Sequence, residues 1–320
     1  MDADFLVAVQ PLIEAFGSLP KLPAHDVNGR RERLKAFVTP IVIPEDVSVT
    51  VFNITSTDGV QIPIHHIKKK TLDPKSPTAA VLHAHGGGLI ALSAEIGITT
   101  YAGIVHETGI QVFSVDYRLA PEHPYPAALD DMWASLTWLH ANAESIGIDR
   151  TRIAVTGESA GGNLAAATTL RARELALSPP LAAQVLIYPM LDDRTVDKTG
   201  NYFVWDGDDN LTGWTAYLQR APGSEDVPIF AAPGRITSAK DLPPLYLECG
   251  QLDLFAVEDT EYVRKFVEAG VPVEFHLNPG LPHAFDGLAP THRVTQQLQQ
   301  NRTRIFQRLQ DGAGNTTSPV

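Results

Sequence analysis

Apolar and polar positions follow two different periods along the chain. Near the start, apolar side chains recur three and four residues apart up to Gly17, at Phe5, Leu6, Val9, Leu12, Ile13 and Phe16. This spacing lines one face of an α-helix, so the pattern predicts an amphipathic helix. A Pro-containing stretch follows, and then a second, basic helix is predicted over residues 30–37. Helices of this kind normally cover an apolar surface elsewhere in the molecule.

From residue 47 onward the pattern changes to short apolar runs bounded by turn residues and helical stretches. Eight such runs predict strands, at residues 47–54, 61–67, 79–84, 111–115, 152–156, 184–188, 244–249 and 273–277. The first two flank Asp58-Gly59 and predict a hairpin, because this dipeptide favours a tight turn. The later six are continuously apolar, as in parallel strands that are buried on both faces.

Helical stretches lie between several of these runs, at residues 126–142, 162–176 and 257–269. Gly270 and Pro272 end the last of them. Strands that alternate with helices indicate an α/β fold. We therefore predict a mostly parallel, doubly wound sheet of eight strands with helices on both faces.

The interval 189–243 breaks this alternation. It is too long for a simple loop, and among its acidic residues and prolines it carries the aromatic residues Tyr202, Phe203, Trp205, Trp214, Tyr217 and Phe230. So many aromatic side chains need a surface on which to pack, although an ordinary surface insertion is the alternative. We expect residues 1–45 and 189–243 to form a helical lid, 46–188 and 244–310 the core, and 311–320 a flexible tail.

Composition narrows the classes of partner. The 320 residues include 25 Lys and Arg against 37 Asp and Glu, a formal net charge of −12, so we expect no nucleic-acid partner. No uncharged apolar run is long enough for membrane insertion. The acidic start differs from a secretory signal, and the one cysteine, Cys249, cannot form an internal disulfide, so a cytoplasmic location is expected. Cys249 ends an apolar run and is expected to be buried in a strand rather than to act as a nucleophile.

A serine between glycines follows the strand predicted at 152–156. The sequence Gly157-Glu158-Ser159-Ala160-Gly161 has the G-x-S-x-G pattern in the strand–turn–helix context that exposes a nucleophilic serine. The turn strains the backbone, so the positions two residues on either side of the serine must lack side chains. The helix N-terminus behind it adds positive potential where an oxyanion would form. A structural or phosphate-binding turn is the alternative for this pattern taken alone.

A second glycine motif, His85-Gly86-Gly87-Gly88, directly follows the strand predicted at 79–84. Glycines leave backbone N–H groups uncovered, so a ligand can approach them closely. We expect the N–H groups of Gly87 and Gly88, with that of Ala160, to form an oxyanion hole at the carboxyl edge of the sheet. A flexible loop is the alternative.

A serine nucleophile needs a base, and the base needs an acid that orients it. When a G-x-S-x-G serine is the nucleophile, the acid and then the histidine follow it in the chain. Asp253 and His283 each come after a late predicted strand, so we predict Ser159, Asp253 and His283 as the catalytic residues. The competing acids Glu258 and Asp259 should lie on the next helix, and the competing base His292 should be a surface residue of a C-terminal helix.

Two histidines are candidate metal ligands. His83 and His85 alternate on one predicted strand and so share a face. However, neither a nearby carboxylate nor a third histidine completes a metal site in the sequence. We therefore expect no metal and no cofactor.

Four motifs in this order resemble those of the hormone-sensitive-lipase family of esterases, also called bacterial family IV. They are the His-Gly-Gly-Gly element at 85–88, the Asp-Tyr-Arg-Leu-Ala-Pro-Glu block at 116–122 followed by Pro124-Tyr125-Pro126-Ala127, the nucleophile block at 157–162, and the Tyr188-Pro189 pair. The resemblance spans residues 79–288 and implies an α/β-hydrolase fold with a lid. It also implies a serine carboxylesterase that uses Ser159, Asp253 and His283, with Gly87, Gly88 and Ala160 as oxyanion donors.

The resemblance further implies a small-molecule ester substrate of short to medium acyl chain, because the family's pocket lies under a small lid. It implies a possible homodimer through the last strand and helix. It gives His85 and the 116–118 block structural roles, and we expect Arg118 and Glu122 to belong to an internal ion-pair network.

The sequence departs from the family at three positions without losing a reacting group. Glu158, Leu254 and Ala284 stand where the family more often has Asp, Pro and Gly.

Relatives that have lost a triad member bind small molecules as receptors, and some plant relatives carry out dehydration. The presence of both Ser159 and His283, with His85 in the oxyanion motif, favours the hydrolase over these two alternatives.

Overall fold

The structure is a computed structural model that describes residues 1–17, 19–73, 75–197 and 202–312. In this part of the chain one sheet has the order β1-β2-β4-β3-β5-β6-β7-β8. Its strands are β1 (Val47–Thr55), β2 (Gln61–Lys69), β3 (Thr78–Ala84), β4 (Gln111–Val115), β5 (Ile148–Glu158), β6 (Ala183–Ile187), β7 (Leu245–Gly250) and β8 (Val273–Asn278). Strand β2 runs antiparallel to β1 and β4, and the other six strands are parallel. The predicted hairpin and the predicted parallel strands are confirmed.

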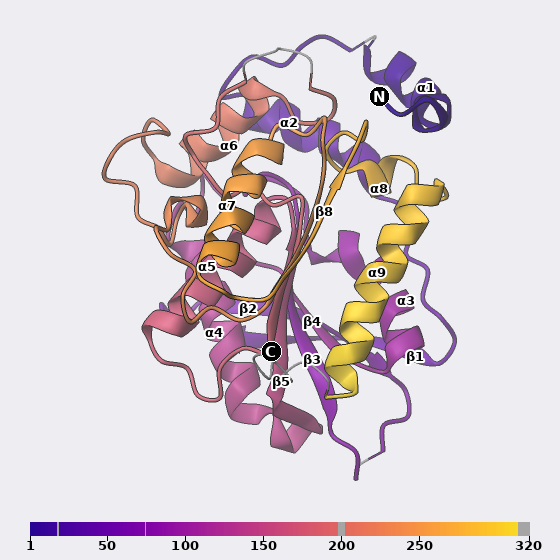
Figure 1. Cartoon of the computed structure of the whole chain (residues 1–320), viewed down its shortest axis with the longest axis vertical. Coiled ribbons are helices and arrows are strands. Elements are labelled where there is room, and N and C mark those ends of the chain that lie inside the picture. The colour runs from indigo at the N-terminus through magenta and orange to yellow at the C-terminus, as the bar shows by residue number, and fades with distance from the viewer. Residues whose placement is uncertain (18, 74, 198–201, 313–320) are drawn as a thin grey trace.

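Helices cover both faces of this sheet. They are α1 (Ala3–Gly17), α2 (Val27–Leu34), α3 (Ile98–Thr108), α4 (Ala127–Asn142), α5 (Ala160–Glu174), α6 (Gly207–Leu218), α7 (Ala256–Glu268), α8 (Phe285–Leu288) and α9 (Arg293–Gln310), with short 3-10 turns η1 (Lys35–Phe37), η2 (Ala94–Gly97), η3 (Glu144–Ile146) and η4 (Pro233–Arg235). Figure 1 shows α3 and α9 on one side of the sheet and α4, α5 and α7 on the other. This is the doubly wound arrangement that the alternation of strands and helices predicted.

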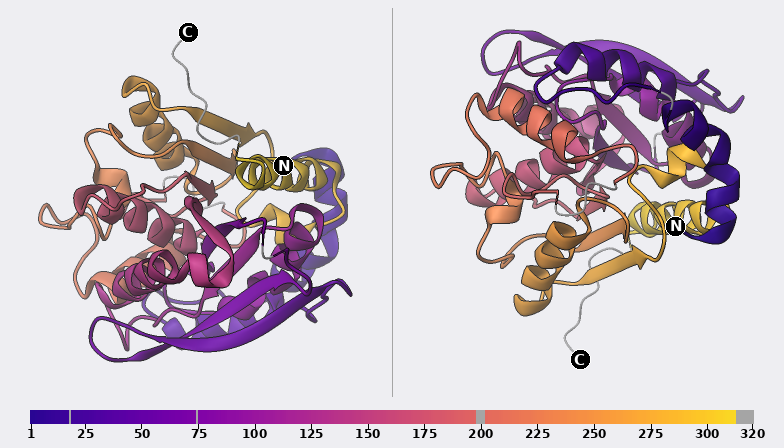
Figure 2. Two further views of the ribbon diagram at one scale, coloured as in Figure 1. Left: turned by 90° about the horizontal axis from the view of Figure 1, so that it is seen from below. Right: turned by 90° about the horizontal axis from the view of Figure 1, so that it is seen from above.

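The second helix begins earlier than predicted. The prediction of a helix over 30–37 becomes α2 (Val27–Leu34) followed by the turn η1 (Lys35–Phe37). The shift arises because Asp26 caps α2: its side chain accepts a hydrogen bond from the Gly29 amide at 2.8 Å. Figure 1 places α1, α2 and α6 together at one end of the sheet, and Figure 2 shows that end from above. Of the predicted tail, only Asp311 and Gly312 lie in the described part.

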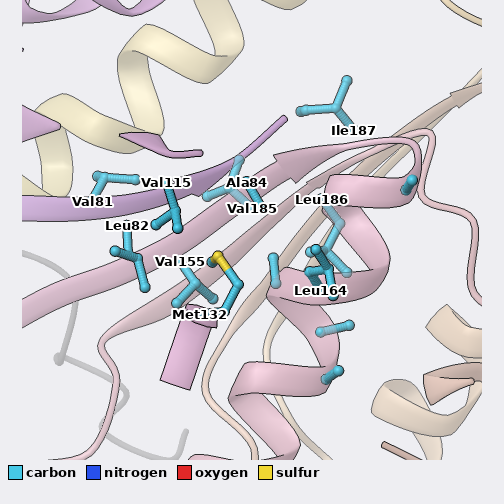
Figure 3. Close-up of a cluster of buried hydrophobic side chains, with 14 of the residues drawn as sticks. Val81, Leu82, Ala84, Val115, Met132, Val155, Leu164, Val185, Leu186 and Ile187 are labelled. Carbon is cyan, nitrogen blue, oxygen red and sulfur yellow. The ribbon is translucent and has the colours of Figure 1, made fainter. Parts of the chain in front are cut away.

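The hydrophobic core lies between the central strands and the helices on each face. Figure 3 shows side chains of β3, β5 and β6 gathered with those of two helices, namely Val81, Leu82, Val155, Val185, Leu186, Met132 of α4 and Leu164 of α5. Each such side chain is almost wholly buried, and burying one contributes about 1.5–3 kcal/mol. This packing fixes α5, whose N-terminus lies directly after Ser159.

The parallel strands bring the predicted site residues to one edge of the sheet. Strand β3 ends just before His85, and its neighbour β5 ends just before Ser159. Asp253 follows β7 by three residues, and His283 follows the adjacent β8 by five. Because the carboxyl ends of parallel strands meet at the same edge, residues far apart in sequence are brought close together here.

Candidate active site

Ser159 occupies a strained turn between β5 and α5. Its backbone has φ 54° and ψ −119°, a conformation that L-residues rarely adopt. A Cβ at Gly161 would lie 1.9 Å from the carbonyl oxygen of Ala84, and one at Gly157 would lie 2.3 Å from the Gly161 backbone. Any residue larger than glycine would therefore force β5 and α5 away from β3. The Ser159 amide donates to the Ile187 carbonyl at 2.9 Å, which ties the turn to β6.

Ser159, His283 and Asp253 form one hydrogen-bonded row. His283 Nε2 lies 3.0 Å from Ser159 Oγ, and His283 Nδ1 lies 2.6 Å from Asp253 Oδ2. The other oxygen of Asp253 accepts the Phe255 amide at 2.9 Å, which fixes the carboxylate. All three residues are less than a tenth exposed. The arrangement has the distances needed for a nucleophile, a general base and an orienting acid.

Two aromatic rings hold the imidazole of His283 between them. The ring of Phe255 meets it edge-on at 5.1 Å between centroids, and the ring of Tyr188 does so at 4.9 Å. Edge-to-face contacts of this kind are favourable beyond the area that they bury. They also restrict rotation of the imidazole, so that its two nitrogens keep their separate partners.

Residues 85–91, here called the glycine loop, form a tight turn beside Ser159. Gly87 has φ +120° and Gly88 has φ +63°, values that favour glycine. The Gly87 carbonyl accepts from the amides of Ile90 and Ala91 at 3.1 and 3.0 Å. Within the described residues neither the Gly87 nor the Gly88 amide has a protein acceptor, so both can donate to a ligand oxygen.

Trp205 packs on the glycine loop from the 189–243 insertion. A Cβ built on Gly88 would lie 2.0 Å from Trp205 Cη2, so the indole ring lies directly against this glycine. A Cβ on Gly213 of α6 would lie 2.8 Å from the Gly88 carbonyl oxygen. The insertion and the loop are therefore in close contact, and only small residues fit on the loop side and the helix side.

His85, the first residue of the glycine loop, is held by several contacts. Its ring stacks on Tyr117 with centroids 4.1 Å apart, its Nδ1 lies 2.7 Å from the Gly86 carbonyl oxygen, and the Tyr117 hydroxyl donates to the His85 carbonyl at 2.7 Å. Burial lowers the pKa of His85 to about 4, so the ring is neutral at pH 7. A neutral imidazole can donate through Nδ1 to Gly86 without placing a charge beside the site.

Arg31 of α2 is a supporting residue that sequence reasoning missed. Its guanidinium donates to the carbonyl oxygens of Ile90 at 2.7 Å and Ala120 at 3.1 Å, and it pairs with Glu122 at 2.6 Å. It therefore connects the N-terminal region to the glycine loop. An arginine in a basic helix carries no sequence signal for partners so far along the chain.

The expected ion-pair network of Arg118 and Glu122 is two separate groups. Arg118 pairs with the fully buried Asp131 at 2.7 Å and with Asp58 at 2.6 Å, whereas Glu122 pairs with Arg31. The expectation that these two residues share a network is therefore wrong. Each lies in the same sequence block, but their side chains meet different elements.

Glu158 lies next to His83, which corrects the expectation that no carboxylate is near this histidine. His83 Nε2 lies 2.8 Å from Glu158 Oε2, and the Tyr101 hydroxyl donates to Glu158 Oε1 at 2.7 Å. Burial opposes ionisation of Glu158, but His83 and Tyr101 outweigh it and hold its pKa below the usual value. Among the described residues no group of three His, Cys, Asp or Glu side chains could hold a metal ion.

The competing acids lie on α7, as expected, and not in the row. Glu258 accepts hydrogen bonds from the amide of Leu191 and the hydroxyl of Thr195, so its side chain contacts the first residues of the 189–243 insertion. Asp259 is fully buried, and burial together with Glu258 and Asp253 holds its pKa well above the usual range. Neither acid has a hydrogen bond to His283 in the structure.

His292 and Cys249 are both buried. The expectation that His292 is a surface residue is wrong: it caps α9 at the N-terminus and packs edge-on against Phe5 of α1 at 5.3 Å. The sequence pattern could not show that α1 covers this position. Cys249 lies in β7 and is wholly buried, as predicted, and burial raises the pKa of its thiol.

A cavity of about 560 Å³ lies beside α6. Its lining includes Asp193, Thr195, Asn210 and Trp214. Ser159, Asp253 and His283 are not among the lining residues, so this cavity is not the space in which a ligand would meet Ser159.

The fold and this arrangement at the strand ends define an α/β hydrolase. A family model described as "alpha/beta hydrolase fold" matches residues 81–287, more than half of the chain. The chain belongs to this family, in its hormone-sensitive-lipase-like branch of bacterial family IV esterases.

Among solved structures, the chain is similar to one titled "Bacterial Heroin Esterase", with a TM-score of 0.87 and 33% identity over 94% of this chain and 97% of that chain. Among curated proteins, it is 36% identical to "Esterase LipI" of Mycobacterium tuberculosis over 68% of this chain and 69% of that protein. It is 30% identical to "Ethyl acetate hydrolase" of Pseudomonas putida over 88% and 90% of the two chains. The protein is therefore an enzyme of the carboxylesterase class.

In its described part, no helix has the length and apolar character needed to cross a membrane.

Proposed function

We propose that the protein hydrolyses small-molecule carboxylic esters by two-step acyl transfer at Ser159. Ser159 Oγ attacks the ester carbonyl carbon while His283 Nε2 takes its proton, and Asp253 stabilises the imidazolium that forms. The oxyanion accepts hydrogen bonds from the amides of Gly87, Gly88 and Ala160. The intermediate then collapses, and His283 returns the proton to the leaving alcohol.

In the second step water takes the place of the alcohol. His283 removes a proton from the water as it attacks the acyl carbonyl. Collapse of the second intermediate breaks the bond to Ser159 Oγ, His283 returns the proton to Oγ, and the acid is released. The ester and one water molecule are the only reactants besides the side chains of this chain. The observation that carries the proposal is the hydrogen-bonded row from Ser159 Oγ through His283 to Asp253, at 3.0 and 2.6 Å. Beside it lie the amides of Gly87 and Gly88, which have no acceptor among the described residues.

We further propose that the acyl chain is short to medium. Trp205 lies directly against Gly88, and Ser159 is only 7% exposed, so the insertion narrows the space around the nucleophile. We propose that the predicted lid, residues 1–45 and 189–243, is the covering that does this. Arg31 and Trp205 support the proposal, because they reach the glycine loop from the two lid segments.

The test is hydrolysis of p-nitrophenyl esters from acetate upward by the wild type and by Ser159→Ala. We expect turnover of acetate to butyrate, weak turnover of long chains, and loss of at least about 10³-fold in kcat for the variant. A fluorophosphonate probe should label the wild type and not the variant. Undiminished hydrolysis by Ser159→Ala would overturn the proposed nucleophile, and a wild type that shows neither labelling nor turnover would favour a receptor.

Two finer expectations also remain proposals. A homodimer is supported by β8, which is an edge strand of the sheet with the exposed Leu277 on it. Light scattering at micromolar concentration tests it, and a monomer mass would overturn it. A cytoplasmic location is supported by the acidic composition and the one buried cysteine.

A further inference from the structure

A buried group of charged and phenolic side chains lies behind His283. Arg302 of α9 is only 4% exposed, and its guanidinium contacts two carboxylates. Its Nε lies 3.0 Å from Glu248 Oε1 of β7, and its Nη1 lies 2.8 Å from Asp286 Oδ2 of α8. The wholly buried Glu248 also accepts the hydroxyl of Tyr246, and Asp286 accepts that of Tyr188 at 2.7 Å.

One arm of this group ends at the proposed base. Asp286 lies three residues after His283, in the four-residue helix α8. A helix this short is not stable alone, so its position depends on contacts with other elements. Arg302 and Tyr188 supply two such contacts, both to the Asp286 carboxylate. The ring of Tyr188 also meets the His283 imidazole edge-on at 4.9 Å.

The other arm does not reach the base. Tyr246 donates its hydroxyl to Glu248, and its ring packs against His276 at 5.4 Å between centroids. Tyr188 and Tyr246 are therefore alike in donating a phenol hydroxyl to a carboxylate that Arg302 holds. They differ in that only Tyr188 contacts His283.

Burial of this group is not explained by stability alone. Replacing a buried ion pair by apolar side chains of similar size is often neutral or stabilising, because charges lose their hydration inside a protein. Burial and the nearby Asp286 raise the pKa of Tyr188 well above the usual range, so its hydroxyl remains a donor at every pH at which the protein would work. The hydroxyl therefore keeps the proton that it donates to Asp286.

We propose that Arg302, Asp286 and Tyr188 form a clamp that sets the position of His283 for proton transfer, which makes them positioning residues for the reaction. The inference rests on the proposed function in that it takes His283 as the base. None of the three touches the reacting atoms. The clamp holds α8 from α9 on one side, and on the other it holds the His283 ring from Tyr188, which directly follows β6.

The test compares Tyr188→Phe with its matched control Tyr246→Phe. Each change removes one phenol hydroxyl from the same buried group and leaves the ring in place, so both should lower the thermal midpoint by a similar amount. We expect Tyr188→Phe to lower kcat about tenfold with KM unchanged, since a small misplacement of a catalytic group has large effects on rate. Tyr246→Phe should keep the kcat of the wild type.

A second readout is the downfield proton resonance of His283 Nδ1–H in its short hydrogen bond to Asp253. We expect Tyr188→Phe to shift or broaden it and Tyr246→Phe to leave it unchanged. Asp286→Asn, which keeps an acceptor for Tyr188 and removes the charge that faces Arg302, should act like Tyr188→Phe.

The clamp is overturned if Tyr188→Phe keeps both the kcat and the resonance of the wild type, or if Tyr246→Phe loses as much as Tyr188→Phe. Failure of the proposed function looks different: the wild type would then be inactive, or Ser159→Ala would be active. The resonance reports on the clamp in either case, because it does not require turnover.

Discussion

The Gly88→Ala substitution adds one methyl group to the glycine loop at a position where the structure has no room for it. The added Cβ would lie 2.0 Å from Trp205 Cη2, 2.7 Å from Cζ2 and 3.0 Å from Cζ3. An ordinary contact needs about 3.4 Å or more, so the ring or the loop must move by about 1 Å or more. Trp205 is only 4% exposed and has little freedom to move.

Two costs follow from this geometry. At φ +63° an alanine is strained by roughly 1–2 kcal/mol, which should appear as lost stability. Displacing the loop by about 1 Å should also misplace the amides that are proposed to bind the oxyanion, and losing one such donor lowers kcat about 10²–10³-fold. We therefore expect kcat for p-nitrophenyl acetate to fall about 100-fold while KM changes little.

Two further variants separate strain from overlap. Gly59→Ala introduces an alanine at φ +89° where no described residue other than its chain neighbours lies within 4 Å of the added Cβ, so it should lose about 1 kcal/mol of stability and no activity. The three atoms that block Gly88 all belong to the benzo ring of Trp205, which Trp205→Phe removes. The double variant Gly88→Ala/Trp205→Phe should recover much of the lost kcat, as a double-mutant cycle would measure.

The reasoning fails if Gly88→Ala retains kcat within about threefold of the wild type, because the loop would then not be held by Trp205 in solution. It also fails if the double variant is as slow as Gly88→Ala while Trp205→Phe alone is active. In that case the lost activity would come from backbone strain and not from the overlap.

Two predictions concern buried titratable groups, and urea unfolding across pH measures both. Burial, Glu258 and Asp253 hold the pKa of Asp259 well above its usual value, so the folded state keeps a proton that the unfolded state releases as pH rises past about 4. Asp259→Asn should therefore be more stable than the wild type at pH 8 by about 1 kcal/mol or more. Equal effects of this substitution at pH 4 and pH 8 would contradict the prediction. Burial lowers the pKa of His66 to about 4 from 6.5, so only the unfolded state gains this proton as pH falls between those values. His66→Gln should therefore make the fall in the free energy of unfolding over this range shallower by about 1.4 kcal/mol per pH unit. An unchanged dependence on pH would contradict the prediction.

The sequence predicts the sheet well because each strand has a recognisable local sequence pattern. Each buried strand is a short apolar run, and the direction of a strand follows from the helix that connects it to the next. The row of Ser159, Asp253 and His283 could be predicted for the same reason: each residue follows a strand, and parallel strands end at a common edge. The helix boundary at Asp26 was missed because a capping aspartate differs little from any other surface aspartate.

Partners chosen by packing could not be predicted. Arg31 contacts a carbonyl 59 residues away in the glycine loop, and nothing in the letters near either position indicates it. His292 is buried because α1 covers it, although it lies next to a polar helix. Arg118 and Glu122 share one sequence block, yet they pair with Asp131 and Arg31, since neighbouring side chains in a loop point to different elements.

The residues that sequence reasoning missed all act on residues that it found. Arg31 holds the glycine loop, and Arg302 contacts the carboxylate that Tyr188 binds behind His283. A motif specifies which groups react, because reacting groups need particular chemistry. Their placement to within a fraction of an ångström depends on many side chains, and several kinds of residue can supply each contact. Differences between members of this family in rate and acyl preference are therefore to be sought in these supporting contacts more than in the motifs.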